Sequence, residues 1–248
     1  LQTHISYIFL TGEYAYKLKK PLDLGFLDFS TLEKRKYYCQ QELNLNQPIA
    51  PDIYLDVLPI TQQNNDIQLN GEGQVVDYVL KMRQFPQSAL LSVMQKEGQL
   101  SESLIIALGK RVATFHQQTK TNDYISQFGQ PEAIAEAINN NYQQTEKYIG
   151  ITQTEKQFQE TKAFTDNFLD SQKSLFQGRV DQGFVRECHG DLHLKNICWW
   201  QDKIQLFDRI EFNEPFRFVD VMYDVAFTVM DLQFRGCPDF AKIGRAHV

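Results

Sequence analysis

A short polar pattern near the end of the chain constrains the fold more than any other feature of this sequence. His189, Gly190 and Asp191 are followed by Asn196 in the pattern H-G-D-x-x-x-x-N, and Asp208 comes later in the chain. Carboxylate and amide oxygens that converge on one point are what a divalent ion with oxygen ligands requires. The pattern therefore favours a fold that brings these separate residues together.

The residues around this pattern predict a loop followed by a β-hairpin. Residues 185–188 read as a short strand that enters the loop, and 196–200 read as a strand that leaves it. A turn at 201–203 would bring the chain back along 204–208. The second carboxylate would then end the returning strand, beside the loop that holds the first.

Kinase-type phosphoryl transfer is the chemistry that uses these residue types in this order. In such a site the protein positions the acceptor hydroxyl and neutralises the charge that develops on the transferred phosphoryl group. Asp191 would accept or orient the acceptor proton, and Asn196 would bind a magnesium ion. Asp208 would hold the metal that bridges the nucleotide phosphates.

The N-terminal residues predict a β-hairpin that presents a lysine. Residues 5–10 and 14–19 read as strands around a turn that contains Gly12. Lys17 and Lys19 share a face because strand side chains alternate, so either could reach the nucleotide phosphates. We favour Lys17, which lies more centrally in the strand. The alternative is a solvated basic strand edge.

A helix is expected after this hairpin. Ser30 and Glu33 form a capping-box pattern, and the helix would end before Pro48. Glu42 is the candidate partner that holds the lysine ammonium against the phosphates, in a nucleotide-binding role. Glu33 is the second choice, because capping already explains it. Most helical glutamates are simply solvated, so Glu42 is a candidate only because the lysine is expected to need a partner.

A strand at 75–82 and the break at 83–86 predict a hinge between two lobes. The chain would then divide into an N-terminal nucleotide-binding lobe, 1–82, and a mainly helical C-terminal lobe, 83–241, which carries the catalytic loop. The pattern G-x-x-x-x-G-K-[ST] does not occur, which argues against a P-loop nucleotide site. Residues 2–6 are the candidate for a loop that covers the phosphates.

The C-terminal lobe is expected to be built mainly from helices. Ser101 caps one of them, and His116 lies at the border of its apolar face, where a packed histidine is expected rather than a ligand. Pro131 begins a second helix at the position where proline is tolerated. A third helix is expected at 154–176. It would bury Phe158, Phe168 and Leu175.

An apolar helix at 220–227 is expected to support the loop that contains Asp191. Asp220 and Asp224 are spaced one helical turn apart, on the same face. Their simplest role is to accept main-chain hydrogen bonds and so brace the loop, in preference to direct metal binding. His189 is expected to orient the same loop.

The overall composition excludes several classes of function. The formal net charge is −6 and no basic stripe stands out, which argues against general nucleic-acid binding. No apolar run approaches the length of a membrane span. The cysteines show no C-x-x-C pair and no zinc spacing, so reduced, packed thiols in a cytoplasmic protein are expected. They are Cys39, Cys188, Cys198 and Cys237.

Both ends of the sequence suggest a fragment. The chain begins with Leu1, and residues 242–248 can be read as the translation of a common sequencing adapter. We therefore expect the native sequence to end near Ala241 and exclude 242–248 from reasoning about the fold. For the same reason His247 is not considered as a ligand.

These residues resemble the aminoglycoside phosphotransferase and choline kinase superfamily. The H-G-D-x-x-x-x-N stretch, Asp208 and residues 223–226 carry this resemblance. Residues 3–6, 16–21 and 25–29 more narrowly resemble an uncharacterised bacterial branch. In that branch the domain is often joined to a C-terminal P-loop ATPase domain, which the resemblance implies as a further part of the full-length protein.

The resemblance implies an α+β, two-lobed protein-kinase-like fold with a small β-rich N-lobe and a larger, mainly helical C-lobe. It also implies Mg²⁺-dependent transfer of the γ-phosphoryl group of ATP or GTP to a hydroxyl of a small molecule. Asp191 would be the catalytic base, and Lys17 would contact the phosphates. Asn196 and Asp208 would be the metal ligands.

One departure and two alternatives accompany this resemblance. Arg209 stands where the superfamily more often has a small or aromatic residue, and Glu211 could add an acidic contact. The G-D-x-H stretch at 190–193 matches a fragment of a metallophosphoesterase, but the other Asp/His blocks of that class do not occur. The remaining alternative is a kinase-like nucleotide-binding module that is catalytically silent.

Overall fold

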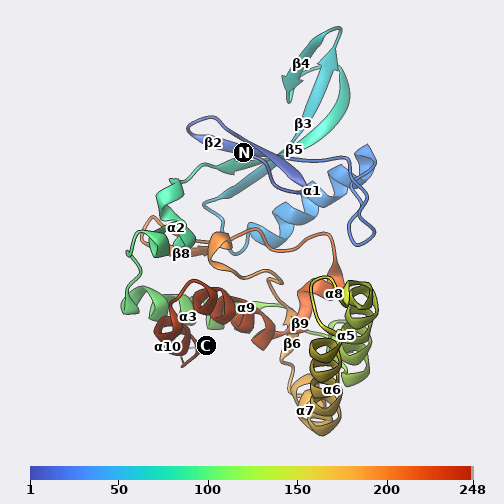
Figure 1. The fold of residues 1–248 in the computed structure, drawn as a ribbon. Coiled ribbons are helices and arrows are strands. Elements are labelled where there is room, and N and C mark those ends of the chain that lie inside the picture. Colours follow the sequence, from blue (N-terminus) through green and yellow to red (C-terminus); the bar gives the residue numbers. More distant parts are fainter. Residues whose placement is uncertain (247–248) are drawn as a thin grey trace. The chain divides into compact units, whose positions relative to one another are not determined.

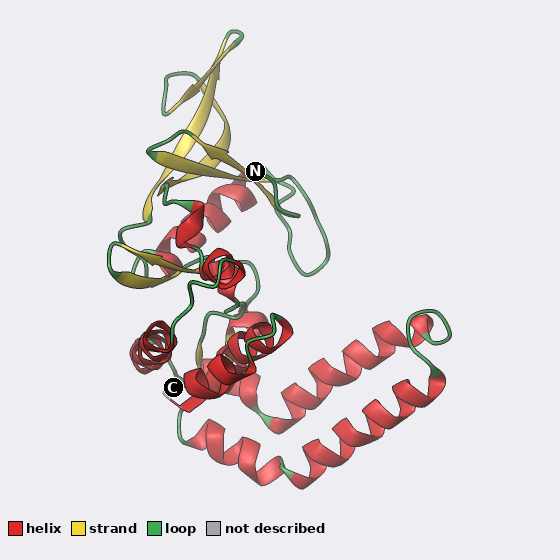
Figure 2. Ribbon diagram, turned by 60° about the vertical axis from the view of Figure 1, so that its left-hand side comes forward, coloured by secondary structure: helices red, strands yellow, loops and turns green. Residues whose placement is uncertain are grey.

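The computed structural model describes residues 1–246, which form two compact units. The first unit contains Leu1–Gln117, His189–Arg217 and the described residues from Asp224 onward, and the second contains Gln118–Cys188 and Phe218–Tyr223. The structure combines antiparallel sheets with helices (Figure 2), so the α+β class is confirmed. The lobe boundary expected at residue 82 lies inside the first unit and stays a prediction. His247 lies outside the described residues.

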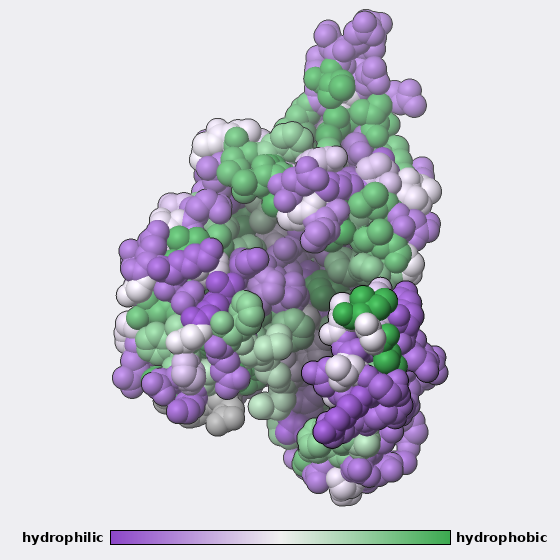
Figure 3. Space-filling model, viewed as in Figure 1, coloured by the Kyte–Doolittle hydropathy of each residue, from purple (hydrophilic) through white to green (hydrophobic). Residues whose placement is uncertain are grey.

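The first unit begins with a five-stranded antiparallel sheet (Figure 1). Its strands are β1 (Ser6–Leu10), β2 (Tyr14–Lys19), β3 (Tyr54–Gln63), β4 (Asp66–Leu69) and β5 (Gln74–Arg83), in the order β1-β2-β5-β3-β4. The strands expected at 5–10, 14–19 and 75–82 are confirmed. The sequence pattern did not indicate β3, which contains Pro59, or β4, which is exposed along its whole length. The tip of their hairpin is hydrophilic (Figure 3).

Strand β2 turns both of its lysines into the interior. Ala15, Lys17 and Lys19 alternate with half-buried residues along the strand and are themselves buried. In register, Lys17 faces Ile8 of β1 and Leu80 of β5. The prediction that the two lysines share a face is therefore confirmed. Buried ammonium groups are costly unless they are paired, so this face of the sheet requires counter-charges.

Helix α1 (Leu32–Asn46) supplies a polar face to the interior of the first unit. Its N-cap is Thr31, whose hydroxyl accepts the Lys34 N–H at 3.3 Å, so the predicted cap at Ser30 is wrong by one residue. The Asp28 carboxylate binds both the N–H and the hydroxyl of Ser30, which holds that residue in a preceding turn. The buried residues of the helix are Arg35, Cys39, Glu42, Leu43 and Asn46.

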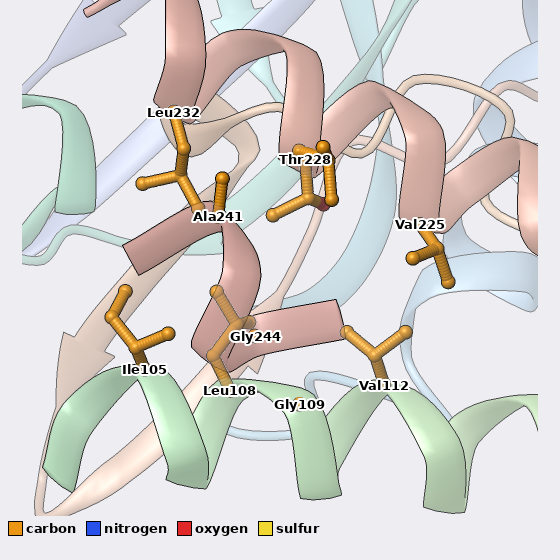
Figure 4. Close-up of a pocket in the computed structure, with 10 residues that line it drawn as sticks. Ile105, Leu108, Gly109, Val112, Val225, Thr228, Leu232, Ala241 and Gly244 are labelled. Atoms are coloured by element: carbon orange, nitrogen blue, oxygen red, sulfur yellow. The ribbon is translucent and has the colours of Figure 1, made fainter. Parts of the chain in front are cut away.

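The rest of the first unit surrounds an apolar core. Its elements are η1 (Gln87–Ala89), α2 (Leu91–Lys96), α3 (Glu102–Gln118), η4 (Leu194–Asn196), β7 (Ile197–Trp200), β8 (Lys203–Leu206), α8 (Glu214–Arg217), α9 (Val221–Phe234) and α10 (Pro238–Ala246). Ser101 Oγ accepts the Leu104 N–H at 3.2 Å, which confirms the predicted cap of α3. Residues of α3, α9 and α10 line a cavity of about 20 Å³ (Figure 4). Its lining is apolar and offers water few partners.

The second unit is mainly helical. Its elements are α4 (Asp123–Ser126), η2 (Gln127–Gly129), α5 (Pro131–Thr145), η3 (Glu146–Tyr148), α6 (Glu155–Ser171), α7 (Lys173–Asp181), β6 (Val185–Glu187) and β9 (Phe218–Asp220). Strands β6 and β9 pair antiparallel, and α5 begins at the predicted Pro131. Val185 and Phe218, from the two strands, pack with Ile125 and Val180 in a small core. Among the described residues, no helix is long and apolar enough to span a bilayer.

The single helix predicted at 154–176 is wrong. The chain forms α6 and α7 instead, and they separate at Gln172, a break that no glycine or proline marks. Phe158 is buried as predicted and packs against Tyr142 of α5, with ring centroids 5.5 Å apart. Phe168 and Leu175 are 45% and 53% exposed, so their predicted burial is wrong. Helical spacing identifies an apolar face but not how far a neighbouring helix covers it.

Candidate functional site

The loop of residues 189–196, called the Asp191 loop below, is held at its start by a buried carboxylate. Asp224 of α9 accepts the main-chain N–H groups of His189 and Gly190, at 2.9 and 2.8 Å, and His116 lies 2.9 Å from the same carboxylate. Burial would raise the pKa of Asp224, but the hydrogen bond and charge of His116 and the neighbouring His189 lower it overall. Asp224 therefore stays ionised while it anchors the loop.

Only glycine fits at position 190. Gly190 has φ of 86°, and a Cβ there would lie 2.5 Å from the main-chain oxygen of Phe216. Both the left-handed backbone and the close approach exclude larger residues. The glycine of the H-G-D pattern thus has a conformational reason, and it brings the Asp191 loop against the segment that ends in α8.

Main-chain and histidine hydrogen bonds connect the Asp191 loop to the residues around Asp208. Phe207 N–H donates to Asn196 O at 3.0 Å, and Ile210 N–H donates to His189 O at 3.2 Å. His189 Nε2 lies 2.9 Å from Phe207 O, and its Nδ1 lies 3.3 Å from the Asp191 N–H. Burial lowers the pKa of His189, so the ring is neutral; it donates from Nε2 and accepts at Nδ1.

Asp191 and Asn196 contact each other directly. Asn196 Nδ2 donates to the main-chain oxygen of Asp191 at 3.0 Å and to its carboxylate at 3.2 Å. His193 Nε2 lies 3.5 Å from the same carboxylate, whose side chain is 38% exposed. Asn196 is buried, and because its amide nitrogen donates to Asp191, its amide oxygen is the atom left for another partner. The loop therefore presents one accessible carboxylate and one oriented amide oxygen.

Asp208 has an uncommon backbone conformation that neighbouring side chains support. Its φ is 64°, and its N–H donates to the hydroxyl of the buried Tyr54 at 2.9 Å. The N–H of Arg209 donates to Asn46 Oδ1, also at 2.9 Å. Residues other than glycine rarely adopt positive φ, and such conformations persist where the surroundings hold them. The Asp208 side chain is 42% exposed, and its Oδ1 lies 2.5 Å from Lys17 Nζ.

Five charged residues, called the Glu42 cluster below, meet at this point: Lys17, Lys19, Glu42, Asp208 and Glu211. One oxygen of Glu42 lies 2.7 Å from Lys17 Nζ, and the other lies 2.6 Å from Lys19 Nζ. Lys19 also pairs with Glu211, and Lys17 pairs with Asp208. With every group ionised, two ammonium groups face three carboxylates, which leaves one negative charge.

The pKa shifts in the Glu42 cluster favour charged lysines. Burial alone would lower the pKa of Lys17, but Asp208, Glu42 and Glu211 raise it well above its usual value of 10.5. For Lys19, burial is likewise outweighed, chiefly by Glu211 and Glu42, and its pKa is also raised. The pKa of Asp208 is lowered, because Lys17 and Lys19 outweigh the effect of its partial burial. Burial raises the pKa of Glu211.

The structure brings most of the predicted site residues into one unit. Lys17 contacts both Glu42 and Asp208, and the Asp191 loop is hydrogen-bonded to the residues beside Asp208. Glu33, the second choice for the lysine's partner, is exposed in the first turn of α1. Asp224 accepts two N–H groups of the loop, which is the bracing geometry expected for it.

Asp220 lies elsewhere. It belongs to β9, and α9 begins only at Val221, so the prediction that Asp220 and Asp224 share a helix face is wrong. The Asp220 carboxylate accepts from Arg179 Nε and Nη2, at 2.5 and 2.7 Å, and from the Met222 N–H at 2.8 Å. It supports β9 and the start of α9 in the second unit.

Two residues of the site, Tyr54 and Asn46, did not emerge as site residues from the sequence. They accept the N–H groups of two consecutive residues, Asp208 and Arg209. Asn46 follows Glu42 by one helical turn and also donates to its main-chain oxygen at 2.9 Å, so a buried polar helix face was the available signal. Tyr54 has no comparable local signal.

No family model matches the chain. It is 28% identical, over 238 residues that make up 96% of its length, to uncharacterized proteins of Mycobacterium bovis and Mycobacterium tuberculosis. Those residues correspond to 46% of each mycobacterial protein, so the chain spans about half the length of the curated relatives it matches. The names of these relatives assign no activity.

Proposed function

We propose that this chain is the kinase-like part of a magnesium-dependent phosphotransferase, which moves the γ-phosphoryl group of ATP or GTP to a hydroxyl of a small molecule. The observation that carries the proposal is the contact of Lys17 with both Glu42 and Asp208, at 2.7 and 2.5 Å. These residues adjoin the loop in which Asn196 is bonded to Asp191. A buried lysine–glutamate pair, an acidic loop and an aspartate–asparagine loop are the parts that kinase-type phosphoryl transfer requires.

The proposed role of Lys17 is to hold the nucleotide phosphates. Its ammonium has one buried partner, Glu42, and one partner on the more open side, Asp208. A phosphate group that approached from the open side would compete with Asp208 for the ammonium, because the phosphate and the carboxylate are both negatively charged. Glu42 would keep the ammonium in place throughout. The raised pKa of Lys17 supports this role, because a charged ammonium is what a phosphate recognises.

The donor atoms at the site fit a magnesium ion. Asp208 uses Oδ1 for Lys17, which leaves its second oxygen, and Asn196 uses its amide nitrogen for Asp191, which leaves its amide oxygen. Magnesium prefers hard oxygen ligands from one or two side chains, together with phosphate oxygens. When bound, it would supply neutralisation of the charge on the phosphates. We assign Asn196 and Asp208 to hold it.

Asp191 is proposed as the catalytic base. Its carboxylate is 38% exposed and is oriented by Asn196 Nδ2, and the loop beneath it is anchored by Asp224. An acceptor hydroxyl within hydrogen-bond distance of this carboxylate would be oriented and would lose its proton to it as the phosphoryl group is transferred. His189 would act only through the loop, as a neutral ring that positions Asp191.

The wider setting of this activity is part of the same proposal. We propose a two-lobed protein-kinase-like fold, a relation to aminoglycoside phosphotransferases and a cytoplasmic location. The proposed partners are a nucleotide and a small-molecule acceptor, with no nucleic acid and no membrane. In the full-length protein, a C-terminal P-loop domain would accompany the kinase-like part.

Nucleotide binding is the first test. Thermal unfolding of the purified chain would be followed with ATP or GTP, in the presence and absence of magnesium. A ligand that binds only the folded state raises the unfolding temperature by mass action. We expect stabilisation that requires magnesium and is weakened in Asp208→Ala. It should be unchanged in the matched control Asp66→Ala, in the exposed strand β4. No magnesium-dependent stabilisation by either nucleotide would contradict the proposal.

Turnover is the second test, measured as nucleoside diphosphate release with a panel of small-molecule alcohols. Asp191→Asn should lower turnover about 10²- to 10⁴-fold, the usual contribution of a general base, with little change in nucleotide affinity. The control Asp202→Asn makes the same substitution in the exposed turn between β7 and β8. Nucleotide binding by the wild-type chain without turnover on any alcohol would favour the catalytically silent module.

A further inference from the structure

The two lysines of β2, which sequence spacing could not separate, have different surroundings. Lys17 reaches from Glu42 to Asp208, whose side chain is 42% exposed. Lys19 is 1% exposed and pairs with Glu211, whose side chain is 4% exposed. The Lys19 ammonium also lies 4.7 Å from the ring centroid of Phe29. Lys19 therefore faces the interior only, and a nucleotide phosphate has no access to it.

The Lys19–Glu211 pair lies at one end of the segment that carries Asp208. Residues 208–211, called the Asp208 segment below, are attached to the sheet and α1 at both ends, in addition to the contact of Asp208 with Lys17. Tyr54 and Asn46 accept the first two N–H groups of the segment, and Lys19 binds the carboxylate of Glu211 at its end. The segment is thus held at both ends, and the accessible carboxylate of Asp208 lies at its first residue.

Glu42 connects this attachment to the phosphate-binding lysine. Each of its two oxygens takes one ammonium, Lys17 on one side and Lys19 on the other, and the glutamate itself is fully buried. A carboxylate held by two fixed cations has little freedom to rotate. If Lys19 lost its partner Glu211, it would compete with Lys17 for Glu42. The position of Lys17 therefore depends on the Lys19–Glu211 pair.

We propose that Lys19 and Glu211 are positioning residues for the metal and phosphate site. Their ion pair fixes the Asp208 segment, so that Asp208 faces the metal and Lys17 stays on Glu42. Glu211 itself is not assigned as a metal ligand, because its carboxylate is buried and pairs with Lys19, whereas the carboxylate of Asp208 is 42% exposed. This inference rests on the proposed function for its metal and nucleotide, but the anchoring of the segment does not.

General energetics favour positioning over simple stabilisation. Burying an ion pair costs desolvation that the attraction between the charges often does not repay, and apolar replacements are frequently neutral or stabilising. Partners that orient metal ligands are different, because their loss typically lowers metal affinity about 10- to 100-fold. The Lys19–Glu211 pair fits the description of a partner that orients a metal ligand. It is buried, it shares Glu42 with Lys17, and it is attached to the segment that carries Asp208.

Hydrogen exchange of the main-chain amides tests the anchoring without any nucleotide. We expect the Asp208 and Arg209 amides to exchange at least about tenfold faster in Glu211→Gln than in the wild type, because local opening becomes easier. The matched control is Glu13→Gln, which removes the same charge from the half-exposed pair of Glu13 with Arg83 on the same sheet. Equal rates in Glu211→Gln and the wild type would overturn the inference.

The magnesium requirement tests the consequence for the site. The measurement is the magnesium concentration that gives half of the maximal ATP- or GTP-dependent stabilisation. Glu211→Gln should raise it about 10- to 100-fold, and Glu13→Gln should leave it unchanged. An unchanged requirement in Glu211→Gln, with normal binding in the wild type, would overturn the positioning role.

A double variant separates positioning from charge balance. Lys19→Met combined with Glu211→Gln removes one positive and one negative charge, so the balance of the Glu42 cluster is kept. We expect it to recover thermal stability relative to Glu211→Gln but to keep the raised magnesium requirement. Recovery of both properties would show that the pair only balances charge. If the wild type binds no nucleotide while the exchange difference persists, the proposed function fails and the anchoring of the segment stands.

Discussion

The Glu42 cluster of the first unit and the ion pair of Arg179 with Asp220 in the second unit use similar charged groups in different surroundings. Both side chains of the Arg179 pair are about a quarter exposed, 26% and 24%. Glu42 and Lys19, in contrast, are 0% and 1% exposed. Removing an ion from water costs several kcal/mol, and attraction repays this only when the geometry is excellent. The exposed pair can serve as local support, whereas the buried cluster is a costly arrangement that suggests a chemical role.

The largest expected effect comes from removing the shared carboxylate. Glu42→Gln should lower the free energy of unfolding by about 3–5 kcal/mol, because two buried ammonium groups lose their common counter-charge. Urea unfolding of the purified variant measures this. The variant should also lose magnesium-dependent nucleotide binding. A loss below about 1 kcal/mol, the usual value for an exposed pair, would remove the contrast between the two regions.

The next expected effect is the loss of the stabilising contribution of Lys17 at alkaline pH. The folded state raises the pKa of Lys17 above its usual 10.5, so its stabilising contribution is complete below that pH. The contribution is lost only as the pH rises through the higher pKa of the folded state.

The measurement is the difference in unfolding free energy between the wild type and Lys17→Met, followed across pH. This difference should be constant from neutral pH to about 10 and should shrink above the usual pKa of lysine. A decline that already begins between about pH 7 and pH 9 would contradict the assigned ion pairs.

The smallest expected effect belongs to the second unit. Arg179→Met should lower the free energy of unfolding by about 1 kcal/mol or less, since the pair with Asp220 is partly solvated. The variant should leave nucleotide binding unchanged, because Arg179 and Asp220 belong to the second unit and the residues assigned to the site belong to the first. A loss of about 3 kcal/mol or more would place this pair with the buried cluster and weaken the comparison.

Some of the residues that the sequence identified have a role that depends on local order, whereas Glu42 and Asp208 were expected beside Lys17 from the requirements of phosphoryl transfer. Asp191 and Asn196 lie five positions apart in one loop, and the turn that joins them determines their contact. The shared face of Lys17 and Lys19 follows from the alternation of strand side chains. In each case the geometry comes from the backbone of one element or one turn, which neighbouring residues largely define.

The residues that the sequence missed act across elements. Tyr54 begins β3 and Asn46 ends α1, and each accepts one N–H group of the Asp208 segment. Their separations from that segment along the chain are large, so no local spacing connects them. The prediction that Phe168 of α6 is buried is wrong for a related reason. Its exposure depends on how far the neighbouring helices extend over it, and helical periodicity does not give that information.

The sequence by itself determined the α+β class, the terminal hairpin, the loop of Asp191 and Asn196, and the pair of lysines on one face. Only the tertiary structure decided that Lys17 reaches Asp208 while Lys19 pairs with Glu211 in the interior. The physical reason is that strand alternation fixes the direction of a side chain but neither its burial nor its partner. Burial and partner depend on which distant segments fold over the strand, and in this protein those segments are α1 and the Asp208 segment.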